Sequence, residues 1–119
     1  MARFSITTIK PAGYTHWQAF DEIRRLLFWS LSDLGYEVSI KDNAIDEGAI
    51  NIIFGSHLLS DVETNMIPKN SIIFNTEQLL GGEQKWRQRV YSLSERLITW
   101  DYARSNIEML NRDYYRGKL

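Results

Sequence analysis

The sequence predicts an α/β domain with a mostly parallel sheet of four or five strands. Short segments rich in β-branched and aromatic residues alternate with longer ones in which apolar residues recur every three or four positions, a pattern typical of strands alternating with helices. Two of the short segments, 49–55 and 71–75, are almost continuously apolar, as expected of strands covered on both faces. The 119 residues suffice for one core, so we expect residues 1–119 to form a single domain.

Two strands and the helix between them account for the first part of the chain. Residues 3–9 and 36–41 alternate between apolar and polar side chains, which predicts the strands. Thr15 and Gln18 have the spacing of a capping box at the start of the helix, and Gly35 is placed to end it in the left-handed conformation. Apolar residues at helical spacing predict its buried stripe, which consists of Trp17, Phe20, Ile23, Leu27, Leu31 and Leu34.

Three further strands follow, and we expect them to be adjacent and central in the sheet. They correspond to residues 49–55, 71–75 and 97–102. A helix is predicted over residues 83–97, and a short one within the long connection 56–68. The last helix is expected to begin near Ser105, because Ser105 and Glu108 have the spacing of a capping box.

The alternation of strands and helices predicts how the sheet is ordered. Right-handed crossovers between parallel strands leave few topologies. We expect the order second, first, third, fourth, fifth, with helices on both faces. The sequence therefore predicts a three-layer Rossmann-like domain.

The composition argues against several classes of function. A net charge of −1 offers no general attraction for nucleic acid. The absence of cysteine excludes thiol catalysis and cysteine-bound zinc, and the two histidines have no recognisable metal-ligand spacing. We see no glycine-rich cofactor or phosphate motif and no membrane-spanning segment. We therefore expect a soluble cytoplasmic protein with no cofactor, no metal, no nucleic-acid partner and no membrane span.

A phosphate-acceptor receiver domain has the same order of elements but needs different residues. It would require acidic side chains after the first strand and an aspartate at the end of the third. Those positions hold Thr7, Thr8, Gly55 and Ser56. The sequence therefore argues against this class.

Polar residues gather where three of the predicted strands end. In an open parallel sheet, ligands bind outside the carboxyl ends of the strands, so we expect these residues on one rim. They are Gly55, Ser56 and His57 after the third strand, Asn75, Thr76, Glu77 and Gln78 after the fourth, and Asp101, Tyr102, Ser105 and Asn106 after the fifth. From the first strand, Thr7, Thr8, Lys10, Tyr14 and His16 could join them.

Structural interpretations of the same residues stay open. Asn75 or Thr76 could cap a short helix, and Ser105 could belong to its capping box instead of a site. His57 could be an exposed loop residue or a catalytic or binding group. Trp100 could pack in the core or serve as a platform for a sugar.

Three segments resemble a known group of proteins. "INIIFGSHLL", "IPKNSIIFNTEQL" and "WDYARSNIEML" are similar to the amino-terminal half of bacterial glycosyltransferase-like proteins with the two-domain B-type fold. The resemblance covers about residues 49–111. In that group the segments after the third, fourth and fifth strands face the cleft between the two domains. The resemblance therefore implies a cleft lined by Gly55, Ser56, His57, Asn75, Glu77, Gln78, Asp101, Tyr102, Ser105 and Asn106.

The resemblance leads to a first hypothesis about function. It implies an acceptor-side domain for a sugar or another polar acceptor, with His57 or Glu77 as the general base. In that architecture the donor is bound mainly by a carboxy-terminal domain, and the sequence ends at Leu119 before one. We therefore expect residues 1–119 to be the first half of a longer protein and to transfer no sugar alone. The second hypothesis is a non-catalytic binding or protein-interaction module that uses the same rim.

Overall fold

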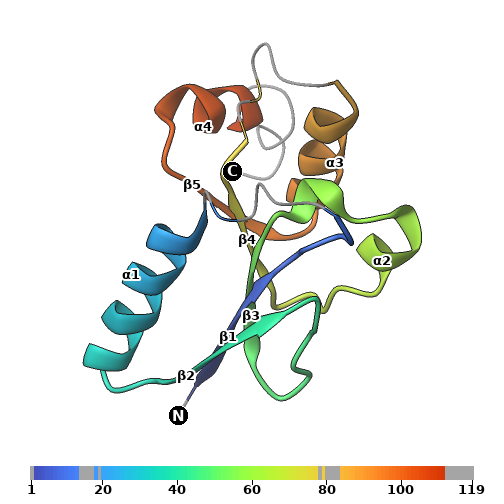
Figure 1. Cartoon of the computed structure of the whole chain (residues 1–119). Coiled ribbons are helices and arrows are strands. Elements are labelled where there is room, and N and C mark those ends of the chain that lie inside the picture. Colours follow the sequence, from blue (N-terminus) through green and yellow to red (C-terminus); the bar gives the residue numbers. More distant parts are fainter. Residues whose placement is uncertain (1, 14–17, 19, 78, 80–83, 112–119) are drawn as a thin grey trace.

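A computed structural model describes residues 2–13, 18, 20–77, 79 and 84–111 (Figure 1). These residues form one sheet of five parallel strands in the order β2-β1-β3-β4-β5, as the sequence predicts. The strands are β1 (Arg3–Thr8), β2 (Glu37–Asp42), β3 (Ile50–Phe54), β4 (Ile72–Asn75) and β5 (Ile98–Asp101).

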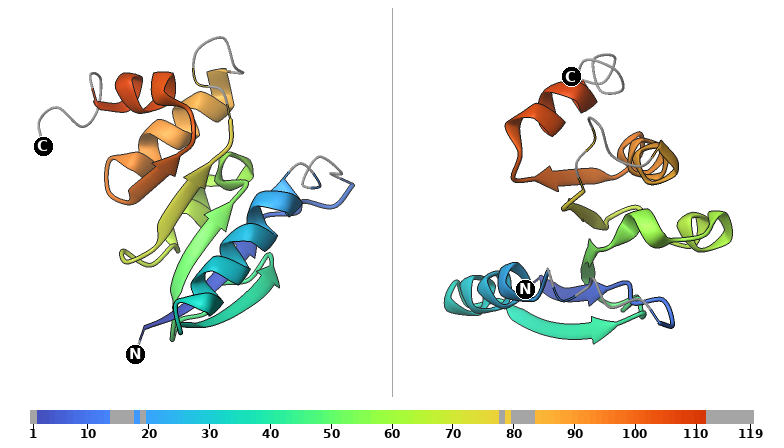
Figure 2. Two further views of the ribbon diagram at one scale, coloured as in Figure 1. Left: turned by 90° about the vertical axis from the view of Figure 1, so that its left-hand side faces the viewer. Right: turned by 45° about the horizontal axis from the view of Figure 1, so that its top comes forward.

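Helices cover the sheet on both faces. They are α1 (Asp21–Asp33), α2 (Asp61–Asn65), α3 (Gln84–Ser94) and α4 (Arg104–Leu110), with a 3₁₀ turn, η2 (Ser56–Leu58), after β3. Figure 2 shows α1 and α4 on one side of the sheet and α2 and α3 on the other, which is the predicted three-layer arrangement. None of the described helices is long and apolar enough to cross a membrane.

Strands β3 and β4, which both lie inside the sheet, bury side chains on both of their faces. Ile52 and Phe54 point into a cluster beneath α1, whereas Ile53 and Ile73 point into a second cluster beneath α2 and α3. All four residues are fully excluded from solvent. The continuous apolar character of these segments is thus explained by cover on both sides.

The end of α1 follows its sequence signal. Gly35 has a φ of 92°, and its N–H donates to the carbonyl of Ser32 at 3.0 Å. The N–H of Tyr36 donates to the carbonyl of Leu31 at 3.1 Å, which completes a Schellman motif. The predicted stripe was wrong in one position, since Leu34 lies in this turn and is 73% exposed. Trp17 and Thr15 lie outside the described residues.

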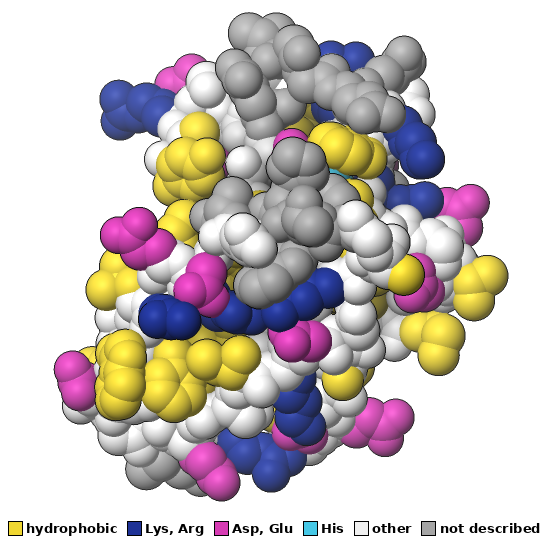
Figure 3. Space-filling view, viewed as in Figure 1, with side chains coloured by type: hydrophobic (Ala, Val, Ile, Leu, Met, Phe, Trp, Pro, Cys, Tyr) yellow, Lys and Arg dark blue, Asp and Glu magenta, His cyan; other side chains and the backbone are white. Residues whose placement is uncertain are grey.

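The fifth strand is adjacent to the fourth, as expected, but it is not central. β5 forms the edge of the sheet, so Ile98 is 64% exposed and Trp100 is partly exposed. Trp100 contacts Phe74 edge-to-face, with ring centroids 6.5 Å apart. Exposed apolar side chains also occur on α1, and Figure 3 shows hydrophobic side chains on the side of the molecule where α1 lies. An apolar run in the sequence predicts a strand, but it does not reveal whether that strand lies at the edge of the sheet or between two others.

The last helix starts differently from the prediction. The N-cap of α4 is Ala103, which has no capping side chain, and the N–H of Ala103 donates to Oδ1 of Asp101 at 2.8 Å. The capping box predicted for Ser105 is therefore wrong. Asp101, at the end of β5, instead holds the main chain just before the first turn of the helix.

The connection between β2 and β3 contains no helix. Residues 43–49 carry the chain across β1, although parallel strands are usually joined through about a dozen residues or more. Asn51, which exposes no surface, holds this loop by accepting from the N–H of Asp46 at 2.9 Å and donating to its carbonyl at 3.0 Å. The Thr7 hydroxyl donates to the carbonyl of Ala44 at 2.7 Å. The loop is thus fastened to the face of the sheet.

Replacing Ile53 or Ile73 by alanine should each lower the free energy of unfolding by about 2 to 5 kcal/mol. Both side chains expose no surface, so the change removes buried methyl groups and leaves a cavity. Urea unfolding of the two variants measures the loss. A loss below about 0.5 kcal/mol at both positions would contradict their placement in the core.

Asn51→Leu should destabilise the domain by about 2 to 4 kcal/mol, although leucine has a similar size. The change leaves main-chain groups of Asp46 without their partner, and each buried group that loses a hydrogen bond costs about 1 to 3 kcal/mol. Asn70→Leu, at an exposed position, is the matched control and should change stability little. Equal unfolding free energies for the two variants would contradict the role of Asn51.

Candidate functional site

The structure brings the ends of β3, β4 and β5 to one rim of the sheet. Nε2 of His57 lies 3.2 Å from Oε1 of Glu77, and Asp101 is joined to the Glu77 main chain through Asn75 and Asn106. The prediction that these segments converge is therefore correct in its geometry. Gln78, Tyr14 and His16 lie outside the described residues.

Two buried asparagines form the centre of this rim. Nδ2 of Asn75 donates to Oδ2 of Asp101 at 2.7 Å and to the Glu77 carbonyl at 3.0 Å. Nδ2 of Asn106 donates to the same two acceptors, at 2.9 Å each. We call Asn75, Glu77, Asp101 and Asn106 the rim network.

The rim network satisfies its own amide groups. Oδ1 of Asn75 accepts from the N–H of Glu77 at 3.1 Å, and Oδ1 of Asn106 accepts from the N–H of Leu79 at 3.1 Å. Asn75 is therefore the last residue of β4 and turns the chain, without serving as the cap of a described helix. Its side chain and that of Asn106 bind protein groups, which ties the loop after β4 to β5 and α4.

His57 is buried beneath an aromatic ring. The residue belongs to η2 and is only 4% exposed. Trp86 of α3 contacts the imidazole edge-to-face, with ring centroids 4.8 Å apart. Nε2 makes no hydrogen bond with the described residues, although Oε1 of Glu77 lies 3.2 Å away. Burial lowers the pKa of His57 to about 4, so the imidazole is neutral at neutral pH.

The remaining predicted residues differ in their accessibility. Gly55 has a φ of 79°, and a Cβ there would lie 3.1 Å from the carbonyl oxygen of Ile9, so this position requires glycine. Ser56 is buried. Tyr102 is exposed, and its hydroxyl donates to the carbonyl of Thr76 at 3.4 Å. Ser105 is exposed as well.

The residues expected to join from β1 make structural contacts. Thr7 and Thr8 are buried, and the Thr8 hydroxyl accepts from Nη1 of Arg24 at 3.1 Å. Nζ of Lys10 lies 3.0 Å from Oδ1 of Asp42. These side chains hold the ends of β1, β2 and α1 together.

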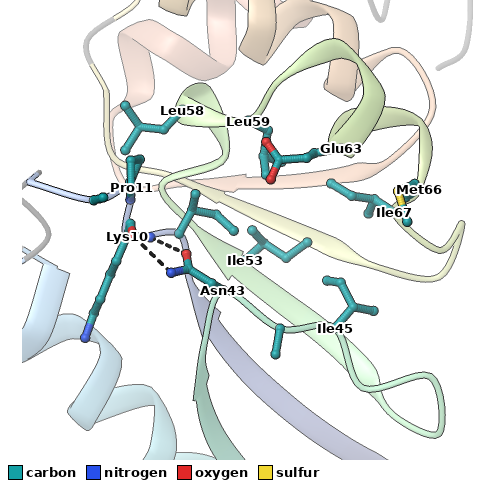
Figure 4. Close-up of a pocket in the computed structure, with 13 residues that line it drawn as sticks. Lys10, Pro11, Asn43, Ile45, Ile53, Leu58, Leu59, Glu63, Met66 and Ile67 are labelled. Carbon is teal, nitrogen blue, oxygen red and sulfur yellow. Dashed lines mark hydrogen bonds between the residues drawn. The ribbon is translucent and has the colours of Figure 1, made fainter.

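A pocket of about 610 Å³ lies at the same end of the sheet, beside β1 and β3. It is lined by residues 9–12, 43–45, 53, 58–59, 63 and 66–67, and we call it the switch-point pocket. Figure 4 shows Ile45, Ile53 and Ile67 along its floor. The chain leaves β1 toward α1 on one face and leaves β3 toward α2 on the other. Open parallel sheets bind ligands at such a reversal of strand order.

This pocket is not among the sites that the sequence predicts. Two signals in the sequence point to it. The connection of residues 43–49 is too short for a helix, which leaves part of a sheet face without helical cover. Ser60 and Glu63 have the spacing of a capping box, and the structure shows that box at the start of α2, beside the pocket.

Comparison with known proteins gives no family for this chain. No family of proteins, no curated protein and no solved structure matches it. The described residues contain no group of three or more side chains able to hold a metal ion. The glycosyltransferase resemblance thus stays a prediction, and the function has to be inferred from the geometry of the site.

His57→Gln should make the free energy of unfolding less dependent on pH between pH 7 and about pH 4.5. Folded His57 stays neutral down to its pKa of about 4, whereas an unfolded imidazole takes up a proton near pH 6.5. The unfolded state binds more protons in this window, so wild-type stability falls by about 2 to 3 kcal/mol as the pH is lowered. Glutamine does not titrate, and the variant loses this component.

Urea unfolding of both proteins at the two pH values measures the difference. Hydrogen bonds lower the pKa of Asp21, Asp46 and Glu63 in the folded state, but these groups are present in both proteins and their contributions cancel. The same pH dependence in wild type and variant would show that His57 is not held neutral by burial.

Proposed function

We propose that this domain is a non-catalytic binding module that holds a small molecule in the switch-point pocket. The observation that carries the proposal is the position of this pocket, where loops from β1, β2 and β3 meet at the carboxyl ends of the strands. Its volume of about 610 Å³ is in the range of pockets that bind small molecules, about 300 to 1,000 Å³. A mainly apolar lining with few polar groups is also typical of such sites.

The burial and hydrogen bonding of the rim residues favour binding over acid–base catalysis. A general base must reach the proton that it removes, and its pKa should be close to the working pH. His57 is buried, and burial lowers its pKa to about 4. Asp101 accepts from Asn75, Asn106 and the N–H of Ala103, so its oxygens are engaged in structural contacts.

An acceptor-side domain of a glycosyltransferase-like protein is the second candidate. The switch-point pocket lies at the end of the sheet that the resemblance assigns to the acceptor, and this position favours the idea. In that case Glu77, which is partly exposed, is a better-placed base than His57. Transfer would still need a donor-binding domain, because both substrates must be held together in a reactive geometry.

Small molecules that bind this domain should perturb the main-chain amides around the switch-point pocket. A fragment library that includes sugars can be screened by thermal shift, where a ligand at a hundred times its dissociation constant stabilises by about 2.7 kcal/mol. Amide chemical shifts in NMR spectra then locate each binder. We expect the largest changes at Ile45, Leu59 and Ile67.

Two tryptophan variants on neighbouring positions provide a matched control. Met66→Trp adds bulk at a position that lines the pocket, whereas Val62→Trp adds it on α2 outside the lining. Both positions are exposed, and the first variant should weaken binding more. Shifts confined to Asp101 and Tyr102, or no binder at all, would contradict the proposal. Turnover of a nucleotide sugar that is lost in Glu77→Gln would favour the second candidate.

A further inference from the structure

The charges around the switch-point pocket are distributed unevenly. Among its described lining residues, Lys10 and Glu63 carry charges. Figure 4 shows that the Lys10 side chain runs away from the pocket, and its Nζ lies 3.0 Å from Oδ1 of Asp42. The positive charge is therefore directed to a carboxylate outside the lining.

The loop after β1 is poorly suited to bind an anion. Its first N–H groups are already used: Ile9 donates to the carbonyl of Phe54 at 2.9 Å, and Lys10 donates to Oδ1 of Asn43 at 2.6 Å. Pro11 has no N–H. Sites for phosphate usually offer several main-chain N–H groups together with a cation. Residues 9–11 offer the pocket neither a set of free main-chain N–H groups nor a cation.

Asn43 cannot compensate for this lack. Its Nδ2 donates to the Lys10 carbonyl at 2.9 Å while its Oδ1 accepts from the Lys10 N–H. Figure 4 shows both bonds as dashed lines. The side chain thus joins the ends of β1 and β2 and contributes mainly its carbon atoms to the pocket wall.

Glu63 presents a carboxylate to the pocket from the opposite wall. Oε1 accepts from the N–H of Ser60 at 2.9 Å, and the Ser60 hydroxyl accepts from the N–H of Glu63 at 3.2 Å. This capping box fixes the side chain, and Figure 4 shows its carboxylate directed toward the interior of the lining. The hydrogen bonds from Ser60 lower the pKa of Glu63, so the group is ionised at neutral pH. Among the described residues, none hydrogen-bonds to Oε2.

We infer that the switch-point pocket selects an apolar molecule bearing an ammonium group, and that it disfavours carboxylates and phosphates. This inference rests on the proposed binding function and adds the class of ligand. The isoleucine floor receives the apolar body, and Oε2 of Glu63 receives an N–H of the cation. A charge-assisted hydrogen bond of this kind is stronger than a neutral one, whereas an anion would meet the Glu63 carboxylate without a compensating positive group.

Three naphthalene compounds that differ in one group test the inference. These are 2-naphthylmethylamine, 2-naphthylmethanol and 2-naphthoate, which at pH 7.4 carry a positive charge, no charge and a negative charge. NMR titration of the whole chain gives their affinities and locates them through the amide shifts. We expect the amine to bind about three to ten times more tightly than the alcohol, and the carboxylate to bind most weakly.

Glu63→Gln separates charge from structure. Glutamine keeps an acceptor for the Ser60 N–H, since capping boxes use Glu or Gln at this position, but it removes the negative charge. The amine should lose its advantage while the alcohol binds as before. Glu47→Gln, which removes an exposed carboxylate outside the lining, is the matched control and should preserve the order of affinities.

The outcomes distinguish this inference from the proposal on which it rests. Amine and alcohol binding equally in the pocket, or the carboxylate binding best, would overturn the charge preference and leave the binding function intact. If Glu63→Gln still prefers the amine, the preference comes from another group, and the role assigned to Glu63 is wrong. If none of the three compounds binds, the inference is wrong, and the fragment screen decides separately whether the pocket binds anything.

Discussion

The loop of residues 43–49 is the constraint on which the arrangement of this domain depends. It must cross β1 to join two parallel strands without the length for a helix. Because Asn51 bonds the main chain of Asp46 and Thr7 bonds that of Ala44, the loop lies against the sheet as a substitute for a helical layer. It supplies one wall of the switch-point pocket, and α2 supplies the opposite wall.

The two parts of the sheet's carboxyl end use polar groups in different ways. In the rim network, carboxylate and amide groups bond one another and the main chain, so the polar cluster after β4 is part of the framework. Beside the switch-point pocket, the capping box occupies Oε1 of Glu63, and the carboxylate lies among the residues that line the pocket. Polar groups that already form hydrogen bonds within the protein contribute little to recognition, because a ligand would have to replace those hydrogen bonds.

His57 illustrates how burial changes the meaning of a residue type. A histidine after a glycine-serine turn is a reasonable candidate for acid–base chemistry when its surroundings are unknown. Beneath Trp86 it becomes a neutral side chain of the interior, and the chemistry available at neutral pH is limited. The same sequence signal therefore supports a structural role once its solvent exposure is known.

The sequence by itself determined the order of the elements, the sheet topology and the burial of β3 and β4. These features follow from apolar periodicity, from Gly35 at the end of α1 and from the handedness of crossovers, all of which are local or topological. The tertiary structure decided that β5 lies at the edge, that Asn75 bonds Asp101, and that a pocket opens between β1, β3 and α2. Each of these depends on contacts between residues distant in the chain, and side-chain spacing carries no information about which distant partner satisfies a polar group or covers a sheet face.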